Sequence, residues 1–196
     1  MIRGLFAGLP QGRLRAAATV VLAIAAVAVS LLAAPGVPGI LGGALALAAI
    51  AIAAIDARWF IIPDQLSAAA FALALINAAV TAPLFVWDAV GVALLRAVVL
   101  GLLFYGLRAF YRRVRGREGI GLGDVKLAAV AGAWLDWLTM PIAIEIAALA
   151  ALAAIGLRHY AGGRPLDAKL KFPFGLFLAP SIWIGWLLEA TWLSPV

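Results

Sequence analysis

The sequence predicts an all-α fold, a polytopic membrane bundle of about seven transmembrane helices, with six to eight as the range. First, 66% of the 196 residues are hydrophobic and only 12% are charged. A soluble domain of this length needs more polar surface to cover its core. Second, the apolar residues form long runs, and runs of about 18 or more indicate transmembrane helices. Third, the basic residues gather in alternate loops, which is typical of membrane proteins.

Glycine and proline divide the apolar runs into successive elements. The first run follows a short basic N-terminus and is longer than a signal-peptide core, so we expect a retained helix. A Pro35–Pro38 turn ends it, Pro63 precedes the third run, and Pro83 ends that run. A glycine-containing segment follows the fourth run. The seven expected spans are Ala16–Ala34, Val37–Ile55, Leu66–Ala82, Ala89–Phe110, Val125–Leu138, Ile142–Leu157 and Phe174–Trp192.

The fifth and sixth spans are short for a bilayer. Either Pro141 kinks one long helix at this point, or the two spans form a tilted hairpin. The seventh run follows Pro173 and is long enough to cross. We expect one integral-membrane domain over residues 1–196, because no segment is polar and long enough to form a separate soluble domain.

The positive charges predict a cytoplasmic N-terminus and an outer C-terminus. In this topology the inner segments are Met1–Arg15, Asp56–Gln65, Arg108–Asp124 and Arg158–Phe172. They hold nearly all Lys and Arg residues, and the outer loops hold none. Only Arg96 falls in the middle of a span. The net charge of +6 therefore marks membrane orientation, and we expect a lipid bilayer and no nucleic acid as partner.

The residue inventory limits the chemistry. The chain has no cysteine, which excludes disulfides, cysteine-ligated metals and a cysteine nucleophile. His159 is the only histidine and lies in a predicted loop, so a serine–histidine site is not expected. We expect no metal and no cofactor. Carboxylates are the remaining catalytic candidates.

Asp56 and Asp124 are predicted at the same membrane depth on the cytoplasmic side. Two neighbouring carboxylates can share a proton and activate a water, because proximity and burial push their pKa values apart. Gly121 and Gly123 would let the chain turn tightly and a substrate backbone approach closely.

Two structural alternatives stand beside this hypothesis. Asp124 could simply cap a helix after a glycine turn. Asp56 could be a solvated residue at a helix end, paired with Arg58. From spacing alone, these alternatives have about the same weight as catalysis.

Three segments in order resemble the type IV prepilin peptidase family. Asp56, six residues, then Pro63-Asp64 is similar to the family's first motif. Gly121-Leu-Gly123-Asp124-Val-Lys126 is similar to its Gly-x-Gly-Asp-x-Lys motif, and Pro173-Phe-Gly-Leu-Phe-Leu178 to its Pro-Phe-Gly-x-Phe-Leu segment. The family-like core spans about 50–182, and residues 1–35 would add an N-terminal helix.

The resemblance implies a membrane aspartyl endopeptidase with Asp56 and Asp124 as the catalytic pair. Its partners would be prepilins or pseudopilins, cut at the cytoplasmic face of a bacterial inner membrane. Asp64 neighbours Pro63, but the family position matches Asp56. Larger family members carry a cysteine-containing insert after the first helix and methylate the product. Here that position is only a turn, so the resemblance implies a short form without methyltransferase activity.

Lys126 has two interpretations of equal weight: it biases the dyad or holds substrate, or it is an interface lysine. Arg96 and Glu145 are predicted at similar depth inside the membrane, so we expect a structural ion pair. Two other functions remain open. A presenilin-like or signal-peptide-peptidase-like protease also uses Gly-x-Gly-Asp, but Ile55 stands where its tyrosine would be. A small transporter or assembly protein would instead depend on Arg96 and Glu145.

Overall fold

The structure is a computed structural model that describes residues 11–116, 119–162 and 173–193. It contains α-helices and one π-helix within these ranges and no strand, which confirms the predicted all-α class. The helices are α1 (Gln11–Ala33), α2 (Val37–Trp59), α3 (Asp64–Thr81), α4 (Val86–Arg115), α5 (Leu122–Trp134), α6 (Thr139–Gly162), α7 (Gly175–Leu188) and the π-helix η1 (Glu189–Leu193). The predicted basic segments around residues 1–10 and 163–172 lie outside the described residues.

Five helices are long and apolar enough to cross a membrane: α1, α2, α3, α4 and α6. Large apolar side chains cover their outer surfaces, such as Val21 at 66% exposure and Leu102 at 63%. Such a surface is stable only against lipid. The chain is therefore a polytopic helical membrane protein.

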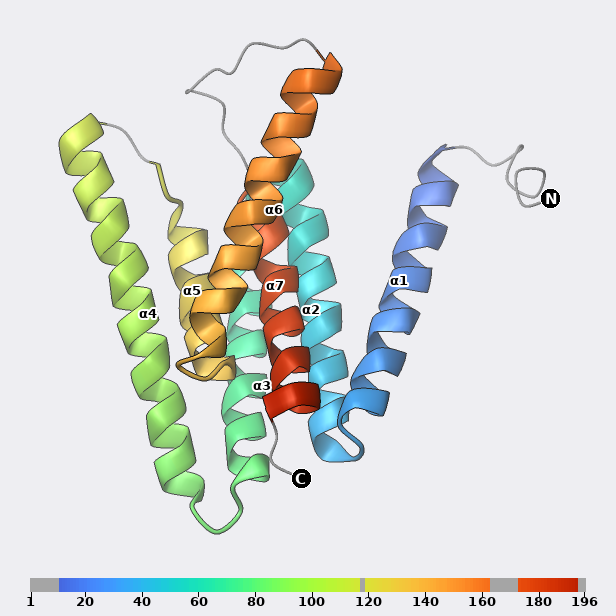
Figure 1. Cartoon of the computed structure of the whole chain (residues 1–196), viewed down its shortest axis with the longest axis vertical. Coiled ribbons are helices and arrows are strands. Elements are labelled where there is room, and N and C mark those ends of the chain that lie inside the picture. Colours follow the sequence, from blue (N-terminus) through green and yellow to red (C-terminus); the bar gives the residue numbers. More distant parts are fainter. Residues whose placement is uncertain (1–10, 117–118, 163–172, 194–196) are drawn as a thin grey trace.

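The shorter helices lie inside the bundle. α5 packs against α3, α4 and α7, and α7 also packs against α2 and α6 (Figure 1). At 13 residues, α5 is roughly 20 Å long, less than the bilayer core of about 30 Å. Small residues of α5, among them Ala128, Ala131 and Gly132, are fully buried or nearly so, which allows close helix approach.

The segment after α5 decides between the two alternatives for the fifth and sixth expected spans. Pro141 does not kink a continuous helix, because the chain leaves the helix at Leu135 and re-enters it at Thr139. Pro141 lies in the first turn of α6, where its missing N–H costs no hydrogen bond. Residues 122–162 therefore form two separate helices, one short and one long, joined by residues 135–138.

α1 stands at one edge of the bundle and packs mainly on α2 (Figure 1). Its contact is at the end next to the Pro35–Pro38 turn, where Ala26 and Ser30 are buried one turn apart. The Trp183 indole of α7 donates a hydrogen bond to the Ser30 hydroxyl at 3.0 Å. Residues 16–22, in the first half of α1, are all exposed.

Candidate active site

The ends of α2, α4 and α6 and the beginnings of α5 and α7 lie at one end of the bundle (Figure 1). Asp56 is in the last turn of α2, and Asp124 is in the first turn of α5. The structure thus places both predicted carboxylates at the same end, as the expected topology predicted.

Asp56 is buried, with only 4% of its surface exposed. Its Oδ2 accepts a hydrogen bond from the backbone N–H of Leu176 at 2.9 Å, and the N–H of Gly175 also points to this carboxyl. Both groups belong to the first turn of α7, where free N–H groups and the helix dipole stabilise negative charge. The solvated, Arg58-paired alternative is therefore wrong for Asp56.

The segment Pro173–Leu178, the third one that resembles the family, thus positions the Asp56 carboxylate. Gly175 is buried, and a Cβ there would lie 2.9 Å from Asp56 Oδ2 and 2.7 Å from Ile62 Cδ1. Real Cβ atoms do not make contacts this short, so any larger residue at position 175 would displace the ends of the Asp56 and Ile62 side chains. Sequence reasoning found this segment only by resemblance and gave it no task.

Asp124 caps its own helix and also faces Asp56. Its Oδ2 accepts a hydrogen bond from the N–H of Gly121 at 3.1 Å, so the capping alternative is part of its role. Burial raises the pKa of Asp124 from 3.8 to about 6. The Gly121 N–H lowers this pKa in part, and the negative charge of Asp56 raises it. The two carboxylates therefore interact electrostatically.

The glycines of the second motif act through contact rather than through unusual backbone angles. Gly121 has φ −72°, outside the left-handed region, so the predicted need for a glycine turn is not what the structure shows. At Gly123 a Cβ would lie 3.0 Å from the Ile62 side chain. Ile62 thus fills the space between the first turns of α5 and α7, beside both carboxylates. Its position follows from the loop that precedes Pro63.

Lys126 and Asp64 form an ion pair, with Nζ and Oδ1 2.6 Å apart. Both side chains are largely exposed, 48% for Lys126 and 73% for Asp64. The pair joins the first turn of α3 to the first turn of α5, two residues after Asp124. Asp64 is therefore separate from the buried carboxylates.

The predicted Arg96–Glu145 pair is wrong. Arg96 instead pairs with Asp136, at the other end of the bundle from Asp56. Glu145 is exposed, because α6 turns Ala143 and Ala147 inward and a residue halfway between them points outward. The expectation from depth did not include the rotation of α6, which packs on α7 and turns Glu145 away from the bundle.

Within the described residues, no group of three His, Cys, Asp or Glu side chains is placed to hold a metal ion. What the site offers is a buried carboxylate held by backbone N–H groups, with a second carboxyl of raised pKa beside it. Fold and site together define a helical membrane protein with an acidic pair at one membrane face.

A sequence model of the type IV leader peptidase family matches residues 43–156, more than half of the chain. The chain belongs to this family. It is similar to the prepilin leader peptidase/N-methyltransferase of Burkholderia pseudomallei (strain 1026b), with 39% identity over 140 residues, 69% of this chain and 42% of that protein.

Two other relatives differ in length. The prepilin leader peptidase/N-methyltransferase of Aeromonas hydrophila is 32% identical over 169 residues, 84% of this chain and 55% of that protein. The leader peptidase HopD of Escherichia coli is 31% identical over 132 residues, 67% of this chain and 82% of that protein. This chain thus spans about half the length of the first two relatives. No solved structure matches it significantly.

Proposed function

We propose that this chain is an aspartyl endopeptidase that removes the leader peptide of type IV prepilins or pseudopilins, with residues 1–196 forming one peptidase domain. The observation that carries the proposal is the buried Asp56 carboxylate, bonded to the Leu176 N–H at 2.9 Å and facing Asp124. Family membership favours this function over a presenilin-like protease and over a transporter.

The two carboxylates differ in surroundings, which assigns them different roles. The N–H groups at the beginning of α7 favour the ionised form of Asp56 and offset part of the effect of its burial, and we assign Asp56 as the general base. Asp124 keeps its proton up to a pH near 6, so Asp124 is the general acid. Because the groups interact, the proton belongs to the pair, and one proton on the pair is the active state.

Hydrolysis then follows in two steps. Asp56 takes a proton from a water, whose oxygen bonds to the scissile carbonyl carbon, while Asp124 donates its proton to the carbonyl oxygen. In the second step the carbon–nitrogen bond breaks, Asp56 returns the proton to the departing amine, and Asp124 recovers its proton from the hydroxyl. The acidic pair ends as it began.

The distribution of positive charge supports a cytoplasmic site in a bacterial inner membrane. Arg58 ends α2, and Arg112, Arg113 and Arg115 end α4, at the same end of the bundle as Asp56. Basic residues gather on the cytoplasmic side of membrane proteins. A basic leader would meet the acidic groups there, Asp64 included, rather than these arginines. We expect peptidase activity without methylation, and the relative HopD is named a leader peptidase.

The test is co-expression of a prepilin from the same source with wild type, Asp56→Asn, Asp124→Asn and Asp64→Asn in membranes. Leader removal is measured as a mass shift of the prepilin. We expect loss of cleavage with Asp56→Asn and Asp124→Asn but retention with Asp64→Asn. Equal cleavage by all four would refute the aspartyl mechanism. Because wild type must cleave for the comparison, several prepilins and pseudopilins are tried in parallel.

A further inference from the structure

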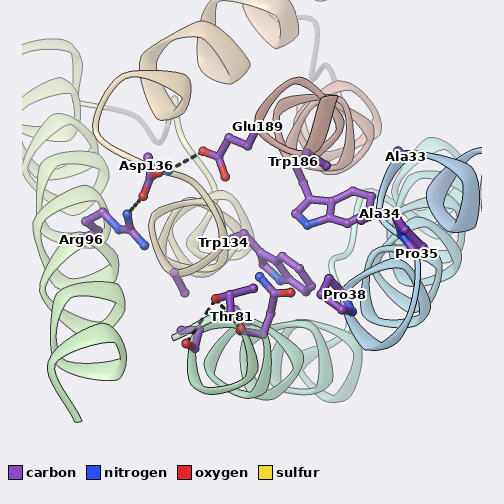
Figure 2. A pocket seen from close by; sticks show the side chains of 15 residues that line it. Ala33, Ala34, Pro35, Pro38, Thr81, Arg96, Trp134, Asp136, Trp186 and Glu189 are labelled. Carbon is purple, nitrogen blue, oxygen red and sulfur yellow. Dashed lines mark hydrogen bonds and ion pairs between the residues drawn. The ribbon is translucent and has the colours of Figure 1, made fainter. Parts of the chain in front are cut away.

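A polar cavity of about 520 Å³ lies at the end of the bundle opposite Asp56 and Asp124. Its size is within the range of small-molecule sites, roughly 300–1,000 Å³. Figure 2 shows Arg96, Asp136 and Glu189 on one side, and Trp186 and Pro38 on the other. The proposed peptidase reaction uses none of these residues.

Two buried polar atoms in this cavity have no partner among the described residues. One is the Nε donor of Arg96, a residue only 8% exposed, whose NH1 group pairs with Asp136. The other is the Oδ1 acceptor of Asn77 on α3. An unpaired buried polar group is costly, so such groups usually meet a ligand or ordered water. A ligand that satisfies both must accept one hydrogen bond and donate another.

The charged side chains of the cavity further restrict the chemical class of the ligand. Arg96 is the only cation that lines it, whereas Asp136 and Glu189 are carboxylates. The Asp136 N–H donates to Glu189 Oε1 at 2.6 Å, which holds the two carboxylates close together. A simple anion would be repelled by these groups. A zwitterion can place its anionic group on Arg96 and its cationic group toward the carboxylates.

The cavity continues sideways between α3 and α4. A second hollow of about 320 Å³ shares Arg96, Asp136, Ala78 and Thr81 with the first and extends to Asp88. Beside it, Leu84 in the turn between the two helices and Trp87 in the first turn of α4 are highly exposed, both at 87%. Exposed tryptophan marks the membrane interface. The hollow therefore opens at the level of lipid headgroups.

We propose that this cavity binds the headgroup of a zwitterionic aminophospholipid, phosphatidylethanolamine, from the leaflet opposite the acidic pair. The phosphate accepts from Arg96, and the ammonium group meets Asp136, Glu189 or Asp88 and donates to Asn77. The acyl chains leave between α3 and α4. A soluble phosphoethanolamine has the same polar chemistry but no chains to occupy that exit.

The test uses the full chain, purified and held in nanodiscs or mild detergent. Ala78→Leu places a bulky side chain in both hollows, and Ala72→Leu is the matched control on the exposed face of the same helix. Lipid retention is measured by native mass spectrometry, and thermal stability is measured with added phosphatidylethanolamine, phosphatidylglycerol, soluble phosphoethanolamine or inorganic phosphate. If Ala78→Leu does not fold, Asn77→Leu, which removes the buried acceptor, takes its place.

We expect wild type and Ala72→Leu to retain phosphatidylethanolamine over phosphatidylglycerol, with binding about tenfold weaker in Ala78→Leu or Asn77→Leu, the loss of about one good polar contact. Equal retention of both lipids, or equal retention by all variants, overturns the proposal. So does stabilisation by phosphate or soluble phosphoethanolamine that equals the lipid effect, since that result defines a site for a soluble ion.

Discussion

Gly175→Ala tests whether the beginning of α7 positions Asp56. The new methyl group would lie 2.9 Å from Asp56 Oδ2 and 2.7 Å from Ile62 Cδ1, so the carboxylate or the helix must move by about half an ångström to reach ordinary contact. A displacement of 1 Å can cost about 100-fold in rate, so we expect kcat/KM to fall by roughly 10- to 100-fold.

The assay is cleavage of a purified prepilin by the enzyme in detergent, with folded protein measured by size-exclusion chromatography. Gly156→Ala is the matched control, because a Cβ at this glycine of α6 meets nothing within 4 Å. We expect Gly156→Ala to keep wild-type activity and stability. If Gly175→Ala is as active as Gly156→Ala, the contact does not position the carboxylate, and the assigned role of α7 is refuted.

Three further predictions concern other groups. The stability contributed by the raised pKa of Asp124 is fully present below about pH 3.8 and is lost as the pH rises through about 6. Wild type should therefore become less stable than Asp124→Asn by up to about 3 kcal/mol over this range. A difference in melting temperature that does not depend on pH would contradict this prediction. Asp64→Lys or Lys126→Asp should each lower cleavage by up to about fivefold, since an exposed ion pair is worth about 1 kcal/mol at most. The double variant Asp64→Lys/Lys126→Asp reverses the pair and should restore cleavage. If cleavage is not restored, the ion pair itself is unimportant. Asp136→Asn should destabilise the protein by about 2 kcal/mol in thermal unfolding, because it leaves the buried Arg96 guanidinium without its charged partner, whereas Glu145→Gln should stay within about 0.5 kcal/mol; the reverse order would restore the partner expected from depth.

Much of the fold follows from the apolar runs and their punctuation. α2 and α3 end and begin beside Pro63 as expected, and α4 ends at Gly116, which adopts φ +67°. The division between α5 and α6 was harder to predict, because Pro141 can mark a break in a helix but is equally stable in a first helical turn. Periodicity alone cannot separate these two uses of proline.

The candidate site was predictable in its residues but not in its contacts. Same-side placement of Asp56 and Asp124 came from topology, and their roles came from resemblance. The hydrogen bond from Leu176 could not be predicted, since a backbone donor carries no mark in the sequence. Asp136 could not be identified as the partner of Arg96, because it lies in the connection between α5 and α6, whose position against α4 is not marked in the sequence. The four-residue spacing of Ala143 and Ala147 is the signal that could have excluded Glu145.

The bond between Asp56 and Leu176 joins residues 120 positions apart in the chain. The ribosome adds roughly 5–20 residues per second, so α7 follows the end of α2 by roughly 6–24 s. During that interval the carboxylate has no helix to hold it. If the proposed catalytic pair depends on this bond, a newly inserted chain would acquire the ability to cut only after α7 has been added to the bundle.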